Sequence, residues 1–75
     1  MKFDYGEEVA LLTTTPTGEV IRRPCCIVGI TVVDTERQVE AFGFPRGTVL
    51  YTVEFGDGSD RLVPEREIEP APSDR

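Results

Sequence analysis

The segment Thr48–Ile68, with the sequence TVLYTVEFGDGSDRLVPEREI, decides the fold. Apolar side chains occupy every second position from Val49 to Phe55, and a period of two places them on one face of a β-strand. The sequence GDGS follows directly, and glycine accepts the positive φ that a tight hairpin turn requires. The pattern therefore predicts a β-hairpin whose second strand spans residues 61–63.

A turn and a short last strand are predicted after the hairpin. Pro64 cannot donate a hydrogen bond to a β-ladder, so it marks the end of a strand. Proline also favours the first position of a helical turn, which predicts a single 3₁₀ turn over residues 65–67. Ile68 then returns a large apolar side chain to the core.

Two more strands are predicted before the hairpin. Residues 8–12 contain a short apolar run, and the sequence TTTPTGE after it is typical of a loop. Residues 25–33 are almost continuously apolar, and Gly29 at their centre allows the sharp bend that a small barrel needs. After a brief pairing at 20–21, Arg22–Pro24 is expected to interrupt the chain before this strand.

The segment that joins residues 25–33 to the hairpin is predicted to be a polar run followed by a loop. The loop carries three large apolar side chains, Val39, Phe42 and Phe44. It either folds back to cap one end of the barrel or exposes its aromatic rings to a partner.

These elements together predict an all-β fold, an SH3-like five-stranded small barrel with one short 3₁₀ turn before the last strand. The chain has 75 residues, which make one small domain with little room for a deep catalytic cleft beside its core. We assign residues 1–69 to the barrel. Residues 70–75 carry too few apolar groups to repay ordering, and we expect a disordered tail there.

The composition points to an acidic protein with reduced thiols. Fourteen acidic residues against eight basic ones give a net charge of −6, which favours basic partners and opposes the capture of nucleic acid. The sequence has no apolar run of membrane-spanning length and no secretory pattern. Cys25 and Cys26 are adjacent and lack the spacing of a disulfide framework. We therefore expect a cytoplasmic protein that has no membrane segment.

No residue pattern predicts catalysis. The sequence contains no histidine, which removes the usual general base and the commonest metal ligand. Adjacent residues of a strand point to opposite faces, so Cys25–Cys26 predicts one core thiol and one inert or partly exposed thiol. Acid pairs such as Glu7–Glu8 are typical of a solvated rim. We expect no enzymatic activity, no cofactor and no metal.

The order of the elements resembles the SH3-like small barrels of known families. The patterns YxVxFxDG at 51–58 and LVPExxI at 62–68 resemble the closing half of Tudor-type and KOW-type barrels. RRP at 22–24, leading into IxG at 27–29 and followed by LYTVEF at 50–55, is similar to the barrel of nitrile hydratase β-subunits and related accessory proteins. FDxGxxV at 3–9 is similar to small bacterial immunity proteins of polymorphic toxin systems. The resemblance implies a barrel that binds other molecules, and it transfers no catalytic residue to this chain.

The leading hypothesis is a non-enzymatic protein-binding module of the toxin-immunity or enzyme-accessory kind, whose partner carries a basic surface. The expected contact anchors are Phe42, Phe44 and Arg46, and the expected charged rim consists of Glu54, Asp57, Asp60, Glu65 and Glu67. An ordinary role stays open for each, because loop phenylalanines also cap barrels and surface acids also keep proteins soluble. A homodimer stays open as well.

Other functions were weighed against this one. Binding of nucleic acid would use the arginines of the two middle loops, Arg22, Arg23, Arg37 and Arg46. A Tudor-like aromatic cage for a cation would use Tyr5, Phe42, Phe44 and Tyr51. A redox role would use Cys25 and Cys26. The acidic net charge disfavours the first, and the alternation around Tyr51 disfavours the second because it places this ring in the core.

Overall fold

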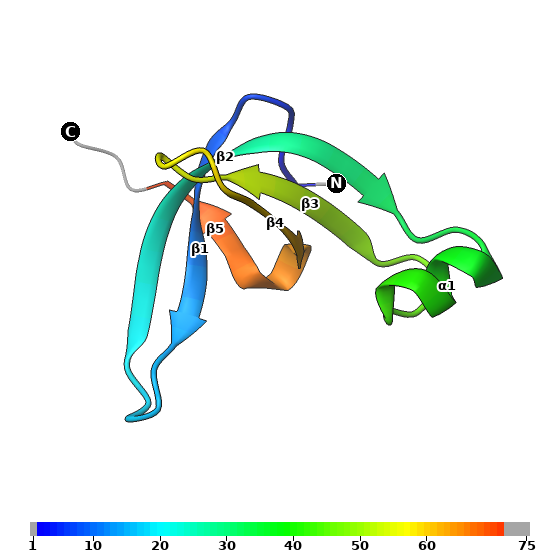
Figure 1. Cartoon of the computed structure of the whole chain (residues 1–75), viewed down its shortest axis with the longest axis horizontal. Coiled ribbons are helices and arrows are strands. Elements are labelled where there is room, and N and C mark those ends of the chain that lie inside the picture. The colour runs from blue at the N-terminus through cyan, green and yellow to red at the C-terminus, as the bar shows by residue number, and fades with distance from the viewer. Residues whose placement is uncertain (1, 72–75) are drawn as a thin grey trace.

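Five antiparallel strands form one strongly curved sheet in the order β4-β3-β2-β1-β5 (Figure 1). The computed structural model describes residues 2–71. Its elements are β1 (Glu8–Thr14), β2 (Val20–Val32), α1 (Glu36–Phe42), β3 (Val49–Glu54), β4 (Asp60–Pro64), a 3₁₀ turn η1 (Glu65–Glu67) and β5 (Ile68–Pro70). η1 joins the two edge strands, β4 and β5, in the chain, and it contacts both β1 and β3. The predicted all-β, SH3-like class is confirmed.

The longest strand, β2, is shared by the two halves of the sheet. Its first half pairs with β1 and its second half pairs with β3. The register with β3 shifts between Ile27 and Gly29, which leaves Val28 as the extra residue of a β-bulge. A bulge bends its strand and increases the local twist, so the sheet folds over on itself at this point. The predicted bend at Gly29 is confirmed.

The predicted interruption of the chain at Arg22–Pro24 is wrong. β2 continues through Pro24, which lies opposite Ala10 of β1. Pairing with β3 begins only at Cys26, so on its other side Pro24 has no ladder to which it would have to donate. The proline is tolerated because it occupies a stretch of β2 that is open on that side.

The hairpin predicted from the sequence is present, with the side chains on the predicted faces. Tyr51 and Val53 are completely buried, and Val63 from β4 lies opposite Tyr51. The turn between the strands is closed by hydrogen bonds from Phe55 N to Ser59 O, 2.9 Å, and from Gly58 N to Phe55 O, 3.0 Å. Gly58 has a φ of 88°, which explains the requirement for glycine there. The core cluster draws on all five strands and also includes Phe3.

The phenol of Tyr51 ties the N-terminal segment to η1. Its hydroxyl donates to Glu65 Oε2 over 2.6 Å, and it accepts from Lys2 N, 3.2 Å, and Phe3 N, 3.3 Å. Glu65 Oε2 also accepts from Lys2 N over 2.9 Å. The ring packs edge-on against Phe3 with the centroids 5.6 Å apart. The hydrogen bond from Tyr51 lowers the pKa of Glu65, and burial together with this bond raises the pKa of Tyr51.

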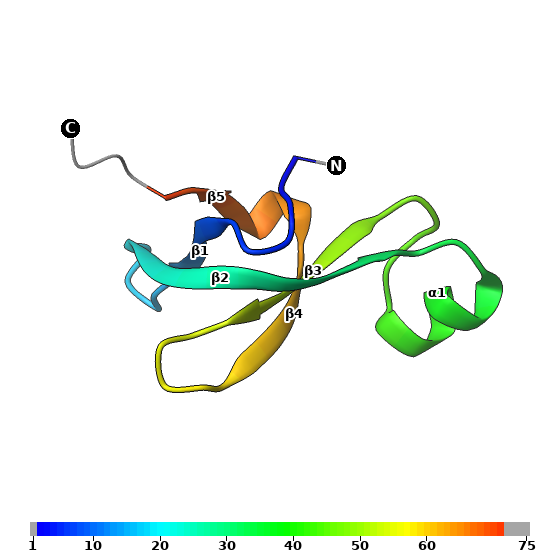
Figure 2. The same ribbon diagram turned by 90° about the horizontal axis from the view of Figure 1, so that it is seen from above.

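The end of the polar run and the start of the predicted loop, including Val39 and Phe42, form a helix, α1, which the sequence analysis missed. Thr35 caps its start: its Oγ1 accepts from Gln38 N, 3.2 Å, and Gln38 Oε1 accepts from Thr35 N, 3.1 Å. Gly43 ends the helix with a φ of 76°. No residue of α1 is buried, and the helix projects beyond the end of β2 and the start of β3 (Figures 1 and 2). Caps at both ends account for the helix better than packing does.

The last strand, β5, extends one residue beyond the expected end of the barrel. β5 includes Pro70, which pairs with Val9, and Ala71 has no regular structure. Residues 72–75 of the tail that was expected to be disordered lie outside the described residues. Within residues 2–71, no helix is both long enough and apolar enough to cross a membrane.

We predict that Gly29→Ala destabilises the fold by about 1–3 kcal/mol because the close approach of Gly29 and Thr52 at the bulge leaves too little room for a Cβ. A Cβ at this position would lie 3.1 Å from both Cβ and Oγ1 of Thr52. Gly56→Ala is the matched control, since its Cβ would meet nothing within 4 Å and Gly56 lacks a positive φ. Urea denaturation measures both variants. Equal stabilities for the two would contradict the steric explanation.

We predict that Tyr51→Phe lowers the free energy of unfolding by about 1–3 kcal/mol, because the groups around the hydroxyl lose their partner. Tyr5→Phe, at a side chain that is 66% exposed, should have almost no effect. The folded-state pKa of Glu65 lies below the unfolded value, so its contribution is present above the unfolded pKa of about 4.3 and is lost as the pH falls through the folded pKa. Urea denaturation between pH 6 and 3 should show a smaller loss on acidification for Tyr51→Phe than for the wild type.

Candidate functional site

The residues predicted to contact a partner fall into three separate places. Phe42 and Phe44 are half-buried at and just after the end of α1, and Arg46 lies nearby, with Nη2 3.3 Å from Glu36 Oε1. Glu65 and Glu67 belong to η1, where the Glu65 carboxylate is already engaged by Tyr51. Glu54, Asp57 and Asp60 lie at the β3–β4 hairpin. Figure 1 shows that this hairpin turn and α1 are at opposite ends of the molecule.

An acidic row crosses four strands at the hairpin end. Glu54 on β3 lies directly opposite Asp60 on β4, and on its other side it faces Cys26 on β2. Cys26 in turn faces Glu8 on β1. Directly opposed residues of an antiparallel sheet project to the same face. We call Glu8, Cys26, Glu54 and Asp60 the acidic row; its three carboxylates are exposed and Cys26 is half-buried.

The carboxylates of the acidic row repel one another, and none of them forms an ion pair with a described residue. Neighbouring strands are about 4.8 Å apart, so the opposed pair Glu54 and Asp60 is destabilising. Among residues 2–71, the ion pairs join Arg22 to Glu69 and Arg46 to Glu36, and neither includes a member of the row. The row therefore presents unneutralised negative charge to solvent.

Asp57 adds to this charge from the tip of the hairpin. Its Oδ1 accepts from Ser59 Oγ, 2.6 Å, and from Ser59 N, 3.0 Å. These bonds lower the pKa of Asp57 and, together with the charge of Arg23, keep it ionised. The guanidinium of Arg23 itself lies over the ring of Phe55, 3.8 Å from its centroid. This cation–π contact holds the guanidinium of Arg23 on the ring of Phe55.

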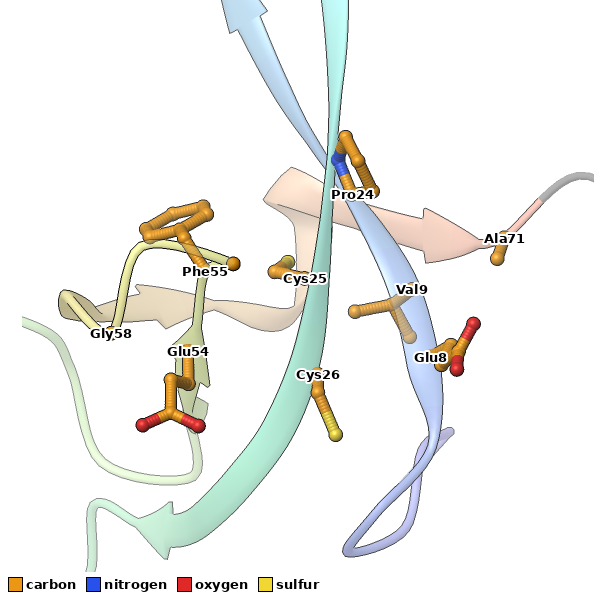
Figure 3. Close-up of a pocket in the computed structure, with 10 residues that line it drawn as sticks. Glu8, Val9, Pro24, Cys25, Cys26, Glu54, Phe55, Gly58 and Ala71 are labelled. Carbon is orange, nitrogen blue, oxygen red and sulfur yellow. The ribbon is translucent and has the colours of Figure 1, made fainter.

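An open groove of about 500 Å³ lies beside the acidic row (Figure 3). Figure 3 shows Glu54 and Glu8 on either side of Cys26. The groove is lined by residues of three strands, of the hairpin turn and of the segment after β5: Glu8, Val9, Pro24, Cys25, Cys26, Glu54, Phe55, Gly56, Gly58 and Ala71. Apolar walls with carboxylates beside them suit a ligand that is both apolar and cationic.

The two thiols occupy the environments predicted for them. Cys25 is buried in the core, and burial raises its pKa. Cys26 is half-buried, and its strand neighbours are the glutamates of the row. Activated cysteines are found beside cations or helix N-termini, which is the opposite arrangement. In the described part of the chain, no group of three or more ligating side chains could hold a metal ion.

The structure does not assemble the other candidate sites. Tyr51 is fully buried and Tyr5 is exposed, while Phe42 and Phe44 lie at the α1 end, so the four rings form no cage. The arginines considered for nucleic acid are also divided, since Arg22 and Arg23 belong to the first half of β2 whereas Arg37 and Arg46 lie in and near α1.

A scan of protein-family models and comparisons with curated proteins and with solved structures find no match to this chain. The resemblance to Tudor-type and KOW-type barrels, to nitrile hydratase β-subunits and to immunity proteins therefore stays a prediction.

The sequence analysis missed Glu8 as a member of this site. Glu8 is more than forty positions away from Glu54 in the sequence. The two lie on either side of Cys26 only because β2 pairs with both β1 and β3. No local pattern carries that information. A register assignment for β2 would have been needed to find it.

We predict that Glu54→Gln stabilises the fold at low salt, by less than about 1 kcal/mol, because it removes the repulsion from Asp60. The gain should shrink as salt screens the charges. Glu19→Gln, an equal change of charge at an exposed position of the β1–β2 loop, is the control. Urea denaturation at two salt concentrations measures both variants, and an equal effect of the two would show that net charge, rather than the row, is responsible.

Proposed function

We propose that this protein is a non-enzymatic binding module that recognises a basic surface on another protein. The observation that supports the proposal is the acidic row, in which Glu8, Glu54 and Asp60 are exposed, share one face and lack ion-pair partners among residues 2–71. An arrangement that costs stability is understandable where a partner supplies the missing positive charge. Asp57 extends the same surface at the tip of the hairpin.

Electrostatic complementarity fits the way a small acidic protein finds its partner. Opposite potentials steer two proteins together and fix their register, and rim charges act mainly on the association rate. The net charge of −6 adds a long-range attraction toward a basic partner. Such a module can act by covering the basic substrate-binding surface of an enzyme, as a toxin-immunity or enzyme-accessory protein does.

The remaining parts of the proposal concern location and the other predicted contacts. Two free thiols fit the reducing cytoplasm, where we place the protein. Phe42 ends α1, and Phe44 and Arg46 follow it in the chain. Because α1 and the β3–β4 hairpin turn lie at opposite ends of the molecule (Figure 1), we assign these residues to a second contact at the α1 end. Glu65 contributes through the fold, because its carboxylate binds Tyr51 and Lys2.

A nucleic-acid function has less support. Arg22 is paired with Glu69, Arg46 is paired with Glu36, and Arg23 is stacked on Phe55. Phosphate binding would require these arginines to leave their partners and to act from two ends of the molecule. The acidic row would repel the backbone of the nucleic acid as well.

A capped peptide of six lysines is a suitable probe for the proposal. We predict measurable binding at low salt, weakening as salt is added. The triple variant Glu8→Gln, Glu54→Gln, Asp60→Asn should bind roughly tenfold more weakly, since each exposed ion pair contributes modestly. Titration calorimetry measures the affinities, and circular dichroism verifies that the variant is folded.

The matched control removes the same amount of charge elsewhere, through Glu19→Gln, Asp34→Asn and Glu40→Gln. It should retain most of the affinity, because only long-range attraction is reduced. Equal losses in the two triple variants would contradict a role for the acidic row. Tight, salt-dependent binding of duplex DNA that Arg22→Ala and Arg46→Ala weaken would replace the proposal with the nucleic-acid function.

A further inference from the structure

An apolar stripe lies next to the acidic row on the same face of the sheet. Gly29, Thr52 and Leu62 are directly opposed across β2, β3 and β4. Thr52 and Leu62 are each two residues along their strands from Glu54 and Asp60, and a step of two residues returns to the same face. Leu62 is 38% exposed, and Val28, the bulge residue between Cys26 and Gly29, is 47% exposed. We call Val28, Thr52 and Leu62 the apolar stripe.

Alternation along β2 explains why an apolar side chain is exposed here, because Val28 is two residues after Cys26 and projects to the same face. Val28 has no partner in the ladder and is not part of the core cluster, although the residues on both sides of it in the ladder, Ile27 and Gly29, are paired. The bulge brings Gly29, rather than Val28, into register opposite Thr52. Gly29 has no side chain of its own, and the Thr52 side chain lies 3.1 Å from where a Cβ of residue 29 would be, so Thr52 occupies the space beside Gly29.

The apolar stripe lies between a buried part and an exposed part of this face of the sheet. One step further along the strands, Leu50 is completely buried and Pro64, which lies opposite it, is buried as well. One step in the other direction lies the acidic row, which is exposed. Val28 and Leu62 are therefore exposed apolar groups directly beside unneutralised carboxylates, rather than isolated surface residues.

We propose that this face binds an amphipathic basic segment of the partner protein, with lysines or arginines on the acidic row and apolar side chains on the apolar stripe. This inference rests on the proposed function and specifies the partner's contact. The row and the stripe are two residues apart along β3 and β4, about 6.7 Å. A bound segment can match this step with residues two apart in an extended chain or four apart in a helix, which rises about 6 Å over four residues.

Charge identifies the occupant as a different protein. A second copy related by a two-fold axis would bring this face against itself, and the two acidic rows would then repel each other. A segment with apolar side chains alone would leave the carboxylates of the row facing an uncharged partner. Only a segment that carries both kinds of side chain satisfies both parts of the face.

Two capped peptides of equal length and charge test the inference. The first combines lysines with leucines, and in the second every leucine is replaced by serine. We expect the leucine peptide to bind about fivefold more tightly, as about half of one leucine side chain leaves water on binding. Titration calorimetry with the full chain measures the affinities, and sedimentation verifies that peptides and protein remain unaggregated.

Val28→Thr and Leu62→Thr test the stripe directly. Both are exposed positions at which threonine keeps the β-propensity, and each should remove most of the preference for the leucine peptide while leaving binding of the serine peptide unchanged. Val20→Thr is the matched control, because Val20 is 53% exposed but is the first residue of β2, eight positions before Val28 along the strand. It should retain the full preference.

The outcomes separate this inference from the proposed function. Equal binding of the two peptides by the wild type would overturn the inference and leave the proposed function standing. Absence of binding by either peptide would overturn both. An equal effect of Val20→Thr and Val28→Thr would overturn the inference, and so would self-association of the wild type that Val28→Thr and Leu62→Thr abolish, because the occupant would then be a second copy.

Discussion

The simultaneous pairing of β2 with β1 and β3 is the constraint on which the rest of the structure depends. The two ladders meet at Cys26, which faces Glu8 on one side and Glu54 on the other. Immediately after it, the bulge at Val28 bends the strand so that both halves enclose one core. The same junction therefore determines the barrel, the position of the acidic row and the exposure of Val28.

The surface beside this junction carries features that a protein selected only for stability would lack. Like charges stand opposite each other at Glu54 and Asp60, and Val28 is exposed beside them. The core, in contrast, contains no buried polar residue among those described, and its one buried phenol is fully hydrogen-bonded. The departures from good packing and good electrostatics coincide on one face, and this coincidence is what favours a binding role for it.

Most of the local structure could be predicted from the sequence, but little of the candidate site could. The hairpin was predictable because alternation, the GDGS turn and Pro64 all agree. α1 was missed although Thr35 and Gln38 form a capping box and Gly43 is a typical helix end, because a helix with no buried face has no apolar periodicity. The path of β2 through Pro24 was missed because tolerance of a proline depends on which edge of the strand is open. The acidic row depends on the register of three ladders, which no local pattern encodes.

The central claim is that the acidic row and the apolar stripe form one binding face for a basic segment of another protein. The most direct test is to follow the backbone amide signals of the labelled protein by NMR during titration with the lysine–leucine peptide. The account predicts that the largest shifts occur at Cys26, Val28, Glu54 and Leu62, while the amides of α1 stay unchanged. Shifts concentrated on α1 and Phe44, or spread evenly over all the acidic residues, would contradict it.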